Sequence, residues 1–144
     1  MKITAIETIR LPDRPNLLLA QVHTDEGIVG LGETSRGPRA VEAQIHEIAA
    51  PYLLGKNPFD IQLHSQKLMN AYLGFSSSSA EVRAASVIDI ALWDIQGQAL
   101  GQPISQLLGG RSRERIKIYN TCAGYHYNTK SVQRRAVTAA DTPA

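Results

Sequence analysis

Alternating apolar and polar residues in the first part of the chain predict a small antiparallel sheet. Three segments carry the alternation, and these are residues 2–10, 17–24 and 28–33. In the second segment, Leu18, Ala20 and Val22 share one side of the strand. Residues 11–16, LPDRPN, interrupt the pattern with two prolines, and TDEG at 24–27 supplies turn residues. The pattern therefore predicts a three-stranded meander.

The apolar spacing then changes to that of helices. Three helical segments follow, at residues 38–50, 59–72 and 79–100, with one short turn within 104–110. Pro51 is expected to end the first, because proline lacks the N–H that a helix interior needs. Ser78 and Glu81 have capping-box spacing at the start of the longest helix, which Gly101 and Pro103 end. Strands followed by helices predict the α+β class, here a meander followed by a helical bundle.

The chain changes character after the last helical turn. Residues 115–125, RIKIYNTCAGY, predict one more strand, and the terminal TAADTPA is typical of a linker or a tail. We therefore expect three parts: a domain at 1–112, a strand segment at 113–128, and a tail or linker at 129–144.

Composition narrows the class of protein. The 144 residues suit one ordinary domain, and a hydrophobic content of 43% is enough for a core. The net charge is +2, and no aromatic residues alternate with the late basic residues, so we expect a solvated face and no nucleic-acid partner. One cysteine, Cys122, allows no intrachain disulfide, which fits a cytoplasmic protein. We see no signal peptide and no apolar run of membrane-spanning length, so no membrane partner is expected.

The longest predicted helix carries two carboxylates that raise the question of catalysis. Asp89 and Asp94 lie five residues apart, which separates them by about 140° around the helix axis. They cannot form a close carboxylate dyad, and apolar residues occupy more than one side of this helix. Because buried carboxylates need partners, we interpret both as structural groups held by arginines or backbone N–H groups.

Other motifs give weaker indications. Gly27, Gly30 and Gly32 in GIVGLGE do not form a dinucleotide-binding fingerprint, and we interpret them as sites of strand twist or of close approach by another backbone. The four histidines are scattered and show no metal-ligand spacing. Glu33 ends a strand before a glycine-containing loop, so it is either a surface acid or a group that meets a ligand.

Several segments, in this order, resemble one known family. They are MKITAIETI, GIVGLGE, APYLLGKNP, AEVRAASVIDIALWDIQGQALGQPISQLLGG and RIKIYNTCAGY. Together they resemble the N-terminal part of the mandelate racemase / muconate-lactonizing branch of the enolase superfamily, from residue 1 to about 128. The stretch that contains IDIALWDIQGQ and GQPISQLLGG is the specific part, and the chain is closest in character to acid-sugar dehydratases.

The resemblance implies a capping domain at 1–112 and the first strand of a TIM-type barrel at 113–128. In the family, the cap closes over the barrel mouth. The barrel supplies carboxylate ligands for Mg²⁺ and the base that removes the proton next to a substrate carboxylate. A whole barrel takes about 250 residues, so those residues are missing from this chain. We expect a fragment or a truncated product that binds no Mg²⁺ and is inactive alone.

The resemblance also implies which residues meet the substrate, a small acid-sugar carboxylate. Two cap loops and the end of the first barrel strand carry them. They are Arg14 and Asn16 in the first loop, Glu33, Thr34, Ser35 and Arg36 in the second, and Asn120, Thr121 and Cys122 on the strand. No catalytic or metal-binding residue is expected within the chain.

Two functions stay open at this stage. The first is the cap of a Mg²⁺-dependent acid-sugar dehydratase or racemase. The second is a non-catalytic interaction or regulatory module derived from such a cap. Family members often form homo-oligomers, and an unpaired strand at 115–125 would present an open β edge, so we expect self-association.

Overall fold

The computed structural model describes residues 1–70 and 79–119. The first elements are three antiparallel strands in the order of the chain: β1 (Ile3–Ile9), β2 (Leu17–Thr24) and β3 (Val29–Ser35). In β2, Leu18, Ala20 and Val22 are fully buried, whereas the residues between them are half-buried. The predicted meander and the predicted inward face of its middle strand are confirmed.

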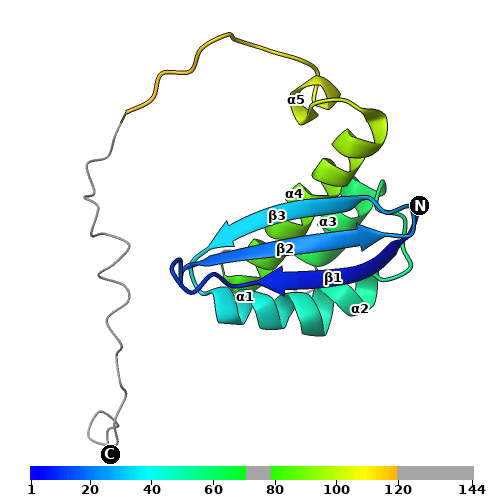
Figure 1. The fold of residues 1–144 in the computed structure, drawn as a ribbon, viewed down its shortest axis with the longest axis vertical. Helices are drawn as coiled ribbons and strands as arrows, with labels where there is room; N and C mark the ends of the chain where they lie inside the picture. Colours follow the sequence, from blue (N-terminus) through cyan, green and yellow to red (C-terminus); the bar gives the residue numbers. More distant parts are fainter. Residues whose placement is uncertain (71–78, 120–144) are drawn as a thin grey trace, which may run out of the picture. The chain divides into compact units, whose positions relative to one another are not determined.

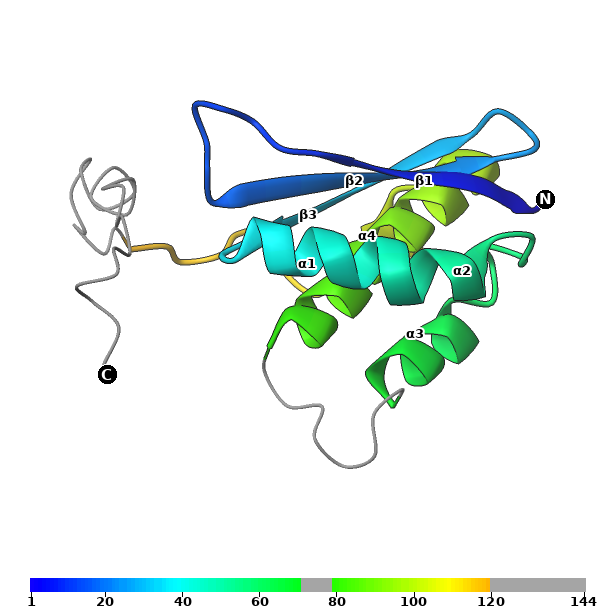
Figure 2. The ribbon, with the colours of Figure 1, turned by 90° about the horizontal axis from the view of Figure 1, so that it is seen from below.

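The helices follow the sheet in the chain and cover one of its faces (Figure 1). Their bounds are α1 (Pro38–Gln44), the π-helical turn η1 (Ile45–Ala49), α2 (Ala50–Leu53), α3 (Ile61–Met69), α4 (Ala80–Leu100) and α5 (Ile104–Leu107). Figure 2 shows the sheet as one layer, with α1 and α4 directly beneath it and α3 beside α4. The α+β class is confirmed.

The expected stop at Pro51 is wrong. The chain stays helical from α1 through η1 and α2, and Pro51 lies in the first turn of α2. In an α-helix, a proline ring collides with the carbonyl four residues earlier. The π-helical turn immediately before α2 pairs residues five apart and widens the backbone, which gives the ring room.

The start of α4 also differs from the prediction. Its N-cap is Ser79, whose hydroxyl donates a hydrogen bond to the Glu81 carboxylate and makes no bond to a backbone N–H. This hydrogen bond holds the pKa of Glu81 below its ordinary value. Ser78 lies outside the described residues. The end of α4 agrees with the sequence, because Gly101 takes the left-handed conformation with φ 60°.

The core lies between the sheet and the helices. Its largest fully buried apolar side chains come from all layers, and they are Ile3, Leu18, Ile45, Leu53, Ile88, Leu92 and Ile95. Helix α4 supplies three of these seven. The helix is buried on more than one side, as its sequence predicted, because it packs on the sheet, on α1 and on α3.

Two glycines of β3 let the strand lie directly on α4. A Cβ atom at Gly30 would fall inside van der Waals contact of the Ala91 carbonyl, and one at Gly32 would meet the Val87 carbonyl. Both glycines are buried. The interpretation as close approach by another backbone is therefore correct at these two positions.

The chain divides into two compact units, Met1–Ser112 and Arg113–Ala144. In the second unit, residues 113–119 form no strand, although the sequence predicts one there. A strand needs a hydrogen-bonded neighbour, and these residues pair with no other described segment. The remainder of the predicted strand, and the tail at 129–144, lie outside the described residues.

Candidate functional site

The two loops singled out in the sequence meet at one end of the sheet. The pairing of β2 with β3 sets Leu17 opposite Ser35, so the chain entering β2 lies beside the chain leaving β3. The link continues one residue further, where the Arg36 N–H donates to the Asn16 carbonyl over 2.9 Å. The fold therefore joins the loop before β2 and the loop after β3 into one surface.

The first loop is a compact turn. The Arg14 N–H donates to the Leu11 carbonyl over 3.1 Å, and the Leu17 N–H donates to the Arg14 carbonyl over 2.9 Å. Arg14 is exposed and Asn16 is half-buried. The turn holds the backbone of both residues at the sheet end.

The second loop divides its residues between the two sheet faces. Gly30 and Gly32 face α4, so strand alternation places Glu33 on the face away from the helices. Glu33 and Ser35 are exposed, and Thr34 is half-buried. Glu33 therefore lies on the side of the sheet opposite to the helices.

Arg36 has an unusual backbone. Its φ is 71°, and it is the one described residue other than glycine with a positive φ. Gly37 follows with φ 64°. A side chain in the left-handed region costs about 1–2 kcal/mol, and such strain is often found at functional sites.

A hollow of about 320 Å³ opens beside Arg36, between the start of α1 and the start of α4. Its lining comes from two parts of the chain: Arg36, Gly37, Ala40 and Val41 on one side, and Ser79, Ala80 and Arg83 on the other. The two arginines form no ion pair with any described residue. The lining of this hollow therefore contains two positively charged residues, no acidic residue and several apolar ones.

The sequence prediction missed Arg83. Helical spacing puts it on the same side of α4 as Ser79, four residues earlier. Its approach to Arg36 depends on β3 and α4 running in opposite directions in contact, which the two buried glycines of β3 allow. The glycines were the signal that could have placed the first turn of α4 next to the loop after β3.

The remaining predicted site residues are not placed. Asn120, Thr121 and Cys122 lie outside the described residues.

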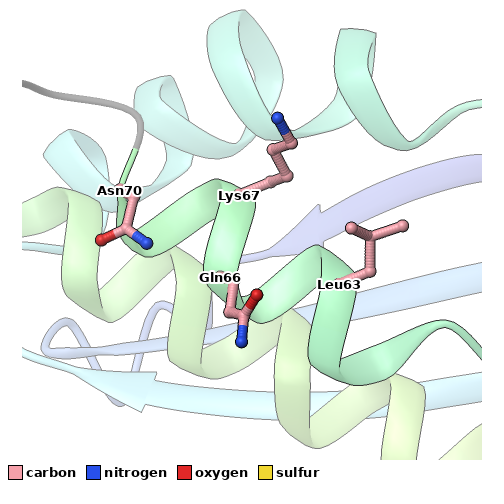
Figure 3. A pocket seen from close by; sticks show the side chains of 4 residues that line it. All are labelled: Leu63, Gln66, Lys67 and Asn70. Atoms are coloured by element: carbon pink, nitrogen blue, oxygen red, sulfur yellow. The ribbon is translucent and has the colours of Figure 1, made fainter.

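A larger hollow of about 400 Å³ is a weaker candidate. It is lined by Leu63, Gln66, Lys67 and Asn70, which come from α3 and its last turn. Figure 3 shows that their side chains leave this helix in different directions. Groups that diverge from one helix do not converge on a ligand, so this hollow lacks the arrangement of a binding site.

The two aspartates of α4 have structural partners. Asp94 Oδ2 accepts the Leu31 N–H over 2.8 Å and the Gln98 Nε2 group over 3.0 Å, and Gln98 Nε2 also donates to the Val29 carbonyl over 2.8 Å. Asp89 is half-buried and bonds the Ser65 side chain, and burial raises its pKa above the ordinary 3.8. The predicted structural interpretation fits both residues, with N–H and hydroxyl groups in place of arginines.

The buried histidine is likewise part of the scaffold. His64 is 1% exposed, and its Nε2 lies 2.9 Å from the Asn57 carbonyl, which can only accept. Its Nδ1 therefore accepts from the Tyr52 hydroxyl at 3.0 Å. Burial raises the pKa of Tyr52, which keeps this hydroxyl a donor.

The sequence predicts neither a metal site nor a membrane span in the described part of the chain. Within residues 1–70 and 79–119, no three His, Cys, Asp or Glu side chains come together as metal ligands would. No helix in that part is both long and apolar enough to cross a bilayer.

Comparison with known proteins decides the family. The profile described as "Mandelate racemase / muconate lactonizing enzyme, N-terminal domain" matches residues 4–109. The chain belongs to the mandelate racemase / muconate lactonizing enzyme family. The matched residues contain all of the sheet except Ile3 and every helix within the described residues, so this unit is the N-terminal domain of that enolase-superfamily family.

Similar proteins from this family include acid-sugar dehydratases. A D-galactonate dehydratase of Pectobacterium atrosepticum is 46% identical over 127 residues, which are 86% of this chain and 32% of the relative. An enolase of the mandelate racemase subgroup from Agrobacterium tumefaciens, solved with sodium and phosphate, is 57% identical with a TM-score of 0.79 over 83% of this chain and 32% of that one. An enolase from Pantoea ananatis with bound D-gluconate and Mg is 36% identical with a TM-score of 0.70, over 80% of this chain and 28% of that one. This chain thus spans about a third of the length of such relatives.

Proposed function

We propose that this chain is the substrate-capping part of a Mg²⁺-dependent acid-sugar dehydratase or racemase. The observation that carries the proposal is the meeting of two polar loops at one end of a family cap domain, with Arg36 beside Asn16. Relatives named for D-galactonate and solved with D-gluconate support a polyhydroxy carboxylate as substrate.

In the proposed reaction, a base removes the proton next to the substrate carboxylate. This proton is only weakly acidic, so the developing negative charge needs strong electrostatic stabilisation. Mg²⁺, when bound by the complete enzyme, would supply that stabilisation as a Lewis acid. The described residues do not fit such a metal site, because they offer no cluster of three suitable ligands. The metal and the base would therefore belong to other residues of the complete enzyme.

The cap's own task in this proposal is to bind the far end of the substrate and exclude water. Arg14, Asn16, Thr34 and Arg36 present hydrogen-bonding groups at one sheet end, which suits the hydroxyls of a sugar acid. Closing such a surface over a reaction removes water and strengthens the electrostatic interactions inside. In this proposal, Asn120 and Cys122 of the strand segment would also contact the substrate, near its carboxylate.

The first test is a direct assay of the 144-residue chain. With Mg²⁺ and a panel of sugar acids, including D-galactonate and D-gluconate, we expect no turnover, since the metal ligands and the base are not provided. Dehydration or racemisation by the purified chain would contradict this part of the proposal.

The second test examines the loops in a chimaera. Residues 1–112 replace the matching part of the Pectobacterium D-galactonate dehydratase, and Arg36→Ala and Glu33→Gln are made in that background. We expect Arg36→Ala to raise KM about tenfold or more for a sugar acid, through loss of charged hydrogen bonds. Arg39→Ala, on the exposed side of α1, serves as the matched control. Unchanged substrate preference in both loop variants would mean that the loop assignment is wrong.

A further inference from the structure

Two arginines, Arg36 and Arg83, line the hollow between the starts of α1 and α4, and the two loops at the sheet end do not account for Arg83. We propose that Arg36 and Arg83 bind a small oxyanion, either a carboxylate or a phosphate, in this hollow. Arg83 has no place in the function proposed above, and the inference stands whether or not the chain caps an enzyme.

The charge around the hollow is one-sided. None of the residues that line it is an aspartate or a glutamate, and neither arginine is paired with a described carboxylate. The nearest acid along the helix is Glu81, two residues before Arg83, so its side chain leaves α4 about 200° away. Glu81 also takes the hydrogen bond of the Ser79 hydroxyl. The two guanidinium groups are therefore left to meet an external anion.

The residue types in the lining suit a small anionic ligand. Guanidinium groups match carboxylate and phosphate oxygens with paired N–H donors, which makes arginine the preferred residue for such anions. A hollow of about 320 Å³ lies at the lower end of the range for small-molecule sites. Ala40, Val41 and Ala80 form an apolar wall that would cover the hydrocarbon part of a carboxylate ligand.

The backbone fixes one of the two arginines at the rim. Arg36 sits at φ 71°, its N–H is bonded to the Asn16 carbonyl, and Gly37 turns the chain into α1. Arg83 is half-buried on the first turn of the 21-residue α4. Partial burial strengthens a charged hydrogen bond relative to a fully exposed one.

The test is calorimetric titration of the full 144-residue chain at constant ionic strength. The probes are inorganic phosphate, the sugar diacid galactarate and the sugar monoacid D-galactonate, each used alone. We expect saturable one-to-one binding of at least one probe, and Arg83→Gln should weaken it about tenfold or more. Strongest binding of phosphate would identify a free phosphate site, and strongest binding of a sugar acid a carboxylate site.

Two further variants keep the test decisive. Arg36→Gly removes the second guanidinium but suits the positive φ, so it should lose binding while its melting temperature is kept or raised. Arg39→Gln removes an equal charge from α1 outside the hollow and should change affinity less than twofold. The proposal is overturned if no probe binds saturably, if Arg36→Gly and Arg83→Gln bind like the parent, or if Arg39→Gln weakens binding equally. An inactive chimaera with intact anion binding would refute the proposed function alone.

Discussion

At the scale of single residues, the contact between β3 and α4 depends on two glycines, which have no side chain to separate the strand from the helix. Gly30 and Gly32 bring the strand backbone against the carbonyls of Ala91 and Val87, and there is no space for a methyl group at either position. Close packing of this kind transmits strain, because a dense interior cannot absorb an added atom.

Gly32→Ala is therefore expected to destabilise the domain by about 3 kcal/mol, since overpacking forces the strand away from the helix. The measurement is urea denaturation of the parent and the variant. Leu31→Ala, at an exposed neighbouring position, is the control and should cost less than about 1 kcal/mol. Equal stability of parent and Gly32→Ala would show that β3 and α4 are not in direct contact.

Asp89 gives a prediction about pH. Burial raises the pKa of its carboxyl above the unfolded value of 3.8, and the Ser65 hydrogen bond opposes this only in part. A raised pKa means that the protonated form favours folding, so this contribution is full below pH 3.8 and is lost as the pH rises through the folded pKa. Asp89→Asn removes the charge but keeps an acceptor for Ser65.

Asp89→Asn should accordingly be more stable than the parent at pH 7, and the difference should disappear below pH 3.8. Urea denaturation at pH 7 and at about pH 3 measures both differences. A variant that is less stable than the parent at pH 7 would mean that the carboxylate has a stabilising partner.

Residue roles were predictable where they follow from local chemistry. The separation of Asp89 and Asp94 and the close approach at the β3 glycines follow from helix and strand geometry. Arg83 was not predictable alone, because its meeting with Arg36 joins two segments that only the packing of β3 on α4 brings together.

At the scale of elements, one edge of the sheet is closed by side chains of a helix. Asp94 binds the Leu31 N–H and Gln98 binds the Val29 carbonyl, so α4 satisfies backbone groups that an edge strand leaves unpaired. These two polar residues lie four apart, on one side of α4. The DIQGQ segment of the family-specific stretch thus has a structural role at this edge.

Asp94→Leu should expose this edge. The Leu31 N–H loses its acceptor at an exposed position, where water can replace it, so the expected cost is about 0.5–1.5 kcal/mol, and the free edge should promote self-association. Denaturation and sedimentation velocity measure the two effects. Asp94→Asn keeps an acceptor oxygen and should remain close to the parent. A monomeric Asp94→Leu variant of parental stability would contradict the assigned role.

Element positions were largely predictable from periodicity, and their ends were not. The three strands and the long helix follow the expected pattern. Helix continuation through Pro51 depends on a π-helical turn that no local signal announced. The sequence predicts a strand at 115–125, but the described residues 113–119 form none. A strand depends on a hydrogen-bonded neighbour, and the sequence alone does not show whether one is present.

At the scale of the whole molecule, the described domain is the N-terminal domain of its family, and its two polar loops meet at one end of its sheet. The residues after Ser112 form a separate unit, in which Ile116 and Ile118 are 73% and 90% exposed. Exposed apolar residues in an extended segment favour association. We therefore expect the chain to self-associate. Sedimentation velocity across a range of concentrations tests this, and the sedimentation coefficient should rise with concentration. A single monomeric species at all concentrations would contradict it.

The chimaera tests the central claim most directly. Its kcat/KM for D-galactonate and related sugar acids is compared with that of the same barrel without any cap. If residues 1–112 are a working substrate cap, the chimaera should exceed the capless barrel by at least about a hundredfold for one sugar acid, since the cap supplies binding and excludes water. A folded, Mg²⁺-loaded chimaera that is no more active than the capless barrel on any sugar acid would contradict the account.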